Sequence, residues 1–121
     1  MPEFTEKELE YLRGQRLARM ATADSGGQPH VMPLGFRVSA DAAAIEVGGR
    51  DFGNTKKYRD MRANPKVAIV IDDLASVTPW RPRGVEVRGR AALQDGAGGP
   101  VPSDQPWARI TPERIVSWGL D

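Results

Sequence analysis

The feature that most constrains the fold of this chain is a series of strand-like segments with too little sequence between them for helices. Side chains alternate in residues 15–24 and again in residues 84–93, and residues 66–72 form a nearly continuous apolar stretch. Alternation is typical of half-buried strands, and a short apolar stretch is typical of a central strand. A doubly wound parallel sheet needs a helix after most strands, and that pattern is absent. We therefore expect a mainly β chain with a few helices, folded as an antiparallel barrel.

Two short helices interrupt the strand pattern. The first begins after Thr5, which forms a capping box with Glu8 three residues later. The second spans residues 54–63 and is closed before Pro65, because the residue preceding a proline avoids the helical region. We expect Asn54 to be the N-cap of this second helix, so that the next residues form its first turn.

Three further segments bring the tally to about six strands. Residues 29–39 form a strand that Pro33 interrupts, so we expect a bulge or an edge there, because proline cannot donate to a ladder. Residues 42–49 form a third strand. Residues 107–120 form one or two short strands, which follow a loop at 95–106 that is predicted by its Gly and Pro content.

The composition excludes several classes of protein. The 121 residues fit one domain, 1–121, and 17 Lys and Arg nearly balance 16 Asp and Glu, which argues against a general nucleic-acid or membrane binder. The chain has no cysteine and one histidine, His30, so disulfides, thiol catalysis and a multi-histidine metal site are excluded. No apolar run reaches membrane-spanning length and the N-terminus does not resemble a signal peptide, so we expect a cytoplasmic protein.

Residues 48–65 come close to a phosphate-binding loop. Gly48 and Gly53 have the spacing of the P-loop motif, but the motif's lysine is missing at its position. A true P-loop also needs a parallel sheet, which this chain does not predict. Lys56 and Lys57 nevertheless fall in the first turn of the predicted helix, where the helix dipole disfavours cations. A bound anion would reverse that penalty, so the segment indicates a phosphate site; the alternative is a solvated basic turn.

Other polar and aromatic residues give weaker signals, and none is assigned as catalytic. His30 could donate a proton near a ring, but a partly buried, hydrogen-bonded histidine is the better interpretation. Ser25 lacks the elbow motif of serine hydrolases. Trp107 and Trp118 are better explained by core or interface packing than by stacking. The pair at 72–73 is interpreted as a solvated strand end, because its two aspartates have no partners at metal-ligand spacing.

The order and spacing of the segments resemble those of a known family. The matching pieces are RLARMATAD, QPHVMPLGF, IEVGGR, NTKKYRDMRANPKVAIVIDD, PWRPRGVEVRGRA and RITPERIVSWGLD. Together they cover nearly the whole chain apart from the loop at 95–106. The chain resembles the split-barrel flavin and deazaflavin proteins of the pyridoxamine-phosphate-oxidase-like superfamily, and more narrowly its F420-dependent enzymes. The resemblance implies an antiparallel split β-barrel and a homodimer with two cofactor sites at its interface.

The resemblance also implies which residues hold the cofactor. In that family the phosphate lies at the start of the helix that NTKKYRD would form, and the ring lies against the strand matching HVMPLGF. The segment matching PWRPRGVEV reaches the cofactor of the partner subunit. Carried onto this chain, the site consists of Met32, Pro33 and Leu34 at the ring, Gly49, Arg50, Asn54, Thr55, Lys56 and Lys57 around the phosphate, and Trp80, Arg81 and Arg83 from the partner strand.

The chain departs from the FMN-using oxidases of the family in two ways. Gly84 stands where those enzymes commonly have a Gln, and no C-terminal pyridoxal-phosphate site is evident. We therefore expect a reductase that moves a hydride from reduced F420 to a conjugated small molecule. The many basic residues of segment 50–62 favour F420, whose lactyl-oligoglutamate tail adds carboxylates beyond its phosphodiester. The alternative is an FMN-binding split-barrel protein, either an oxidoreductase or a carrier without turnover.

Overall fold

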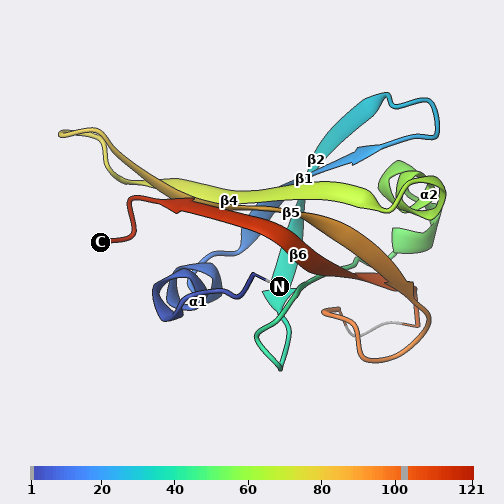
Figure 1. The fold of residues 1–121 in the computed structure, drawn as a ribbon. Helices are drawn as coiled ribbons and strands as arrows, with labels where there is room; N and C mark the ends of the chain where they lie inside the picture. Colours follow the sequence, from blue (N-terminus) through green and yellow to red (C-terminus); the bar gives the residue numbers. More distant parts are fainter. Residues whose placement is uncertain (1, 102–103) are drawn as a thin grey trace.

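The structure is a computed structural model that describes residues 2–101 and 104–121. In these residues it contains two α-helices and six strands, as the sequence predicted (Figure 1). In chain order the elements are α1 (Glu6–Arg13), β1 (Leu17–Ala23), β2 (Pro29–Val38), β3 (Ile45–Val47), the 3-10 helix η1 (Phe52–Asn54), α2 (Lys56–Ala63), β4 (Lys66–Ser76), β5 (Arg81–Gln94) and β6 (Trp107–Trp118).

The strands form a closed antiparallel barrel, which confirms the predicted fold class. Their order around the barrel is β1-β2-β3-β6-β5-β4, and β1 completes the circle by pairing with β4. The long β4–β5 hairpin dominates the view in Figure 1. Helix α2 lies at the end of the hairpin where β4 begins, and the turn between β4 and β5 projects from the opposite end.

Alternate side chains of the strands fill the barrel. In β4 every second residue from Val67 to Ile71 is buried, and the residues between them face outward. This is the arrangement that period-two alternation predicts for a sheet with one face on the core. The largest fully buried side chains are Phe52, Leu12, Met20, Ile45, Ile69, Ile71, Ile110, Val47, Val85 and Val87.

The final segment forms one long strand, which corrects the expectation of one or two short strands. The register of β6 against β5 shifts by one residue, from the pair Arg88–Arg114 to the pair Gly89–Pro112. A bulge of this kind frees one ladder position, so the proline is accommodated without ending the strand. A Cβ atom at Gly89 would collide with the main-chain oxygen of Thr111, so the close approach at the bulge requires glycine.

Strand β2 is an edge at Pro33 and does not bulge there. Residues 29–35 pair with β1 in unbroken register, whereas β3 pairs only with residues 36–38 of β2. One side of residues 29–35 is therefore not paired to another strand, and we call this side the open edge of β2. Of the two outcomes predicted for the proline, the edge is confirmed.

Helix α1 confirms its predicted start, and helix α2 corrects its predicted start. The Thr5 hydroxyl accepts from the main-chain N–H of Glu8 at 3.1 Å, and the Glu8 carboxylate accepts from the N–H of Thr5 at 2.8 Å. The N-cap of α2 is Thr55 and not Asn54, which belongs to the preceding 3-10 turn. The Asn54 side chain instead donates to Asp51 at 2.7 Å.

The remaining segments match the sequence in outline. Residues 95–101 and 104–106 contain no helix or strand, as the loop prediction requires, and positions 102–103 of that loop lie outside the described residues. Neither of the two α-helices in the described part of the chain is long and apolar enough to span a membrane.

Candidate functional site

The start of α2 offers main-chain donors and the positive end of a helix dipole. The Thr55 hydroxyl donates to the carbonyl of Phe52 at 2.7 Å and accepts from the N–H of Tyr58 at 3.2 Å. Lys56 and Lys57 are the first two residues of the helix. Their N–H groups have no helical carbonyl four residues earlier to accept from them, so the helix supplies them with no acceptor. Such a terminus is suited to an anion, which is what the sequence predicted for this position.

Lys56 is already paired within the chain. Its Nζ lies 3.1 Å from Oδ1 of Asp60, which is only 3% exposed, and Oδ2 of Asp60 accepts from the Thr22 hydroxyl at 2.8 Å. Burial raises the pKa of Asp60, but the hydrogen bonds from Thr22 and Lys56 and the charges of Lys56 and His30 outweigh it and lower the pKa. The carboxylate is therefore ionised at neutral pH and offsets the charge of Lys56.

Lys57 has no carboxylate partner among residues 2–101 and 104–121. Its Nζ lies 5.7 Å from the ring centroid of Phe52, and burial lowers the pKa of its ammonium group. A partly desolvated cation that lacks an anion gains more from a bound phosphate than one that is already paired. The structure thus separates two lysines that the sequence treated alike.

The other residues predicted around the phosphate differ in whether contacts within the chain already engage them. A Cβ at Gly49 would meet no atom within 4 Å, and Arg50 is exposed in the same loop. Asn54 is held by local contacts, because its carbonyl accepts from Arg59 at 3.2 Å and its amide donates to Asp51. Arg50 is therefore open to a ligand, whereas one N–H of the Asn54 side-chain amide is already used by Asp51.

The predicted ring residues lie on the open edge of β2. Pro33 is opposite Arg19 in the β1–β2 ladder and has no N–H to give. A proline fits this ladder when its nitrogen faces away from the partner strand, so the main-chain groups of Val31 and Gly35 also face the open edge. The Met32 side chain is 44% exposed, but the Leu34 side chain is buried in the core. A ring at this edge would therefore meet main chain and not the Leu34 side chain.

The residues predicted to reach a partner subunit lie at the other end of the molecule from α2. Trp80 is 67% exposed, and Arg81 begins β5 directly after the turn that projects from the barrel in Figure 1. Helix α2 lies at the opposite end of the hairpin. Within one chain, the hairpin turn and the start of α2 do not form one site.

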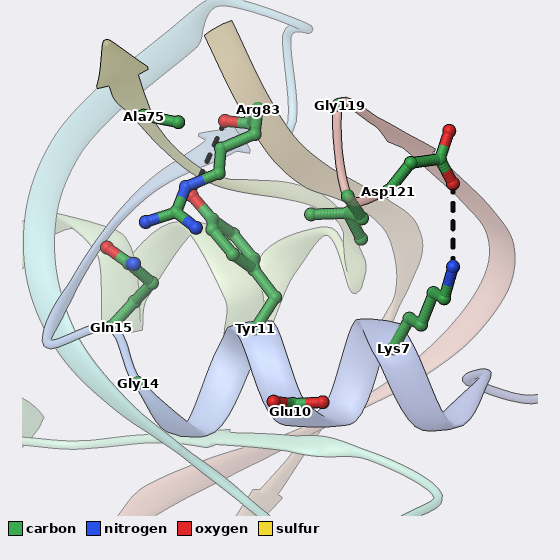
Figure 2. A pocket seen from close by; sticks show the side chains of 10 residues that line it. Lys7, Glu10, Tyr11, Gly14, Gln15, Ala75, Arg83, Gly119 and Asp121 are labelled. Carbon is green, nitrogen blue, oxygen red and sulfur yellow. Dashed lines mark hydrogen bonds and ion pairs between the residues drawn. The ribbon is translucent and has the colours of Figure 1, made fainter. Parts of the chain in front are cut away.

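Arg83 is held by contacts inside the chain. Its Nε and one terminal nitrogen donate to the two oxygens of Asp73 at 2.7 and 3.0 Å, and its guanidinium lies 5.1 Å from the ring of Tyr11. The Tyr11 hydroxyl donates to Asp73 at 2.9 Å and points toward Arg83 in Figure 2. Asp73 is therefore a structural ion-pair partner, which corrects its interpretation as a solvated residue; Asp72 is exposed and pairs with Arg19 at 2.6 Å.

Neither the pocket in Figure 2 nor the groove beside residues 14–19 gathers the predicted site. The pocket of about 360 Å³ in Figure 2 lies between α1 and the C-terminal residues and includes Arg83 alone of that set. A groove of about 480 Å³ beside residues 14–19 includes Pro33 alone. The phosphate, ring and hairpin residues therefore occupy three separate places on one subunit.

Sequence reasoning missed the residues that hold these groups in place. Asp60 follows Lys56 by four residues, a spacing that predicts a helical ion pair, so this contact was open to prediction. The contacts of Thr22 with Asp60 and of Tyr11 with Asp73 join residues 38 and 62 positions apart, and no local pattern indicates them. His30 is half-buried as expected, and its Nδ1 has no hydrogen-bond partner among the described residues.

The fold and the basic helix start define a small split-barrel protein, and comparisons with known proteins agree. A family model described as pyridoxamine 5'-phosphate oxidase matches residues 4–119. The chain belongs to this family.

Individual relatives are consistent with the family. The chain is 40% identical to a 5a,11a-dehydrotetracycline/5a,11a-dehydrooxytetracycline reductase of Streptomyces rimosus, over 98% of this chain and 84% of the relative. A conserved hypothetical protein of Mycobacterium tuberculosis has the same fold, with a TM-score of 0.77 at 20% identity over 97% of this chain and 86% of its own. A protein named F420 reductase gives a TM-score of 0.68 at 21% identity, over 96% of this chain and 98% of its own. The family and the 40%-identical reductase support an oxidoreductase.

Proposed function

We propose that this protein is a reductase that uses reduced F420 to reduce a carbon–carbon double bond conjugated to a carbonyl in a polycyclic small molecule. The observation that carries the proposal is the 40% identity, over 98% of this chain, to a reductase named for its 5a,11a-dehydrotetracycline substrates. The prefix dehydro in that name denotes an added double bond in a fused-ring compound. We propose only the class of the substrate, which is a fused-ring enone.

The residues at the start of α2 fit the phosphate of such a cofactor. Lys57 supplies a partly desolvated cation without a carboxylate in the described chain, and Thr55 caps the helix, whose first N–H groups have no acceptor within the helix. Arg50 lies exposed in the loop before it. Charge-assisted hydrogen bonds of this kind contribute roughly 1.5–3 kcal/mol each. We assign Lys57 the main role, with Arg50 and Thr55 in support.

The open edge of β2 fits the ring. Its main chain offers the carbonyl of Pro33 and the amide groups of Val31 and Gly35, and the exposed side chains of Val31 and Met32 give it an apolar border. When bound in its reduced form, F420 supplies a hydride. The chain's own contribution is to bind and orient the ring, and to present an apolar surface on which a fused-ring substrate can lie. We assign no side-chain acid, because a solvent proton suffices for the second carbon of the double bond.

We propose that a second copy of the chain completes the site. The hairpin turn with Trp80 lies at the far end of its own subunit from α2, so it can contribute to a cofactor site only on a partner (Figure 1). Leu17 and Val77 are exposed apolar side chains that a homodimer would cover. We also propose that the protein acts in the cytoplasm.

FMN is the second candidate cofactor. It needs fewer cations than F420, and two ion pairs within the chain reduce the number of cations that are free to bind a ligand. Lys56 is paired with Asp60 and Arg83 is paired with Asp73, so these two cations are less available to the carboxylates of an F420 tail. Exposed cations remain at Arg50, Arg62 and Arg81, and exposed pairs with a tail are worth under about 1 kcal/mol each.

Parallel titrations of the purified protein with F420 and with FMN, followed by tryptophan fluorescence, decide between the cofactors. We expect F420 to bind more tightly, with an affinity that falls more steeply with salt because of its extra charges. Turnover is then measured with reduced F420 and a fused-ring enone. Equal or tighter binding of FMN, or FMN retained through purification, would favour the alternative.

A further inference from the structure

A continuous set of hydrogen bonds connects helix α2 to strand β1. The Thr22 hydroxyl of β1 donates to Oδ2 of Asp60 at 2.8 Å, and Oδ1 of Asp60 accepts from Lys56 at 3.1 Å. Thr22 and Asp60 are both only 3% exposed. Both oxygens of one buried carboxylate are thus used, one toward the barrel and one toward the first turn of the helix.

The same connection extends to the strand that carries the open edge. Thr22 lies directly opposite His30 in the antiparallel ladder between β1 and β2. The ladder continues in unbroken register to the pair Arg19–Pro33, so the two strands form one continuous hydrogen-bonded unit. Asp60 therefore ties the start of α2 to the same unit that presents the open edge.

We propose that Thr22 and Asp60 are positioning residues that set the distance between the phosphate position at the start of α2 and the ring position at the open edge of β2. This inference rests on the proposed function. A cofactor whose phosphate and ring are joined by a flexible chain binds both positions at once with a high effective concentration, but only when their spacing matches the chain. Neither residue needs to touch the cofactor to act in this way.

The variant Thr22→Val tests the proposal, because valine has nearly the shape of threonine but lacks the hydroxyl. Binding is measured for three probes: intact F420, its deazaflavin ring fragment without phosphate, and inorganic phosphate. We expect the variant to bind F420 about tenfold more weakly, while its affinity for each fragment stays within about twofold of the parent. Thr22→Ser, which restores the hydroxyl, should recover most of the affinity for F420.

Two results would overturn the proposal. One is unchanged F420 binding by Thr22→Val, and the other is an equal loss for all three probes, which indicates a general disturbance of the fold. Ile110→Val is the control for lost stability, because Ile110 is fully buried on β6 and is not part of this network. This control should bind F420 as the parent does. If Thr22→Val does not fold, Thr22→Ala takes its place with the same expected pattern.

Failure of the proposed function would give a different pattern. If the parent binds FMN and not F420, the same series is run with FMN, riboflavin and inorganic phosphate. The positioning role is then tested independently of which cofactor the protein uses. If Lys57→Ala binds the intact cofactor as the parent does, the phosphate position is wrong, whatever Thr22→Val shows.

Discussion

At the scale of single residues, the two lysines at the start of α2 have different surroundings and should have different roles. We expect Lys57→Ala to weaken cofactor binding by about tenfold or more, since it removes a charge-assisted hydrogen bond. Lys56→Ala should weaken binding less, because Lys56 already faces Asp60 at 3.1 Å. Fluorescence titration of both variants checks this order. An equal loss in the two variants would contradict it.

Lys56→Ala should instead lower the stability of the fold. It leaves one oxygen of the buried Asp60 without its partner, which costs about 1–2 kcal/mol. Urea unfolding of the protein without cofactor measures this loss. Lys57→Ala serves as the control, because it removes no ion pair in the described structure.

The lowered pKa of Lys57 has a consequence for the dependence of stability on pH. Burial lowers this pKa in the folded chain below the ordinary value of 10.5, so between the two values the unfolded chain binds more protons. Stability from this group therefore rises with pH across that window. Relative to Lys57→Met, the parent should gain unfolding free energy as pH increases toward about 10. Cofactor affinity should fall over the same range, because the phosphate needs the charged lysine.

At the scale of elements, the packing of β6 on β5 explains why glycine occupies position 84. A Cβ there would lie 2.6 Å from Cζ2 of Trp118 and 2.8 Å from the main-chain oxygen of Ile71. Gly84→Ala should therefore lower the unfolding free energy by about 1–3 kcal/mol, as overpacking does. Gly49→Ala is the control for stability, since its Cβ would meet no atom within 4 Å. Thermal unfolding of both variants compares the two positions.

Elements with a local cause were predictable from the sequence, and elements with a distant cause were not. The start of α1 followed from Thr5 and Glu8, and the edge at Pro33 followed from its missing N–H. The continuity of β6 depends on a bulge opposite Gly89, which lies on another strand. The N-cap of α2 moved to Thr55 because a 3-10 turn, closed by local hydrogen bonds, includes Asn54.

The candidate site was predictable only in part, for the same reason. The basic residues at the helix start were visible in the sequence. The contacts that already engage two of the predicted cations, Lys56 and Arg83, were only partly predictable, because some of them join residues far apart in the chain. Lys56 pairs with a residue one helical turn away, whereas Arg83 is held together with Tyr11, which lies 72 positions earlier. A charge count overestimates the cations that are free to bind a ligand, because only the fold shows which are already paired.

At the scale of the whole molecule, we predict that the protein is a homodimer in solution. The reason is that one subunit keeps the hairpin turn and the start of α2 at opposite ends, and leaves Leu17 and Val77 exposed. Light scattering should give about twice the chain mass of 13.2 kDa at micromolar concentration. A monomer mass throughout that range would contradict both the dimer and the shared site.

The proline in the open edge of β2 also bears on how the molecule behaves at high concentration. An unpaired strand edge can template further strands from other chains, and proline is one of the residues that prevents this. Pro33→Val would make residues 31–34 a continuous apolar stretch with two β-branched residues and no missing donor. We expect this variant to aggregate into thioflavin-binding fibrils during storage while the parent stays in solution, and Pro82→Val, outside that edge, should not. The residue that shapes the predicted ring position would then also protect the protein from self-association into fibres.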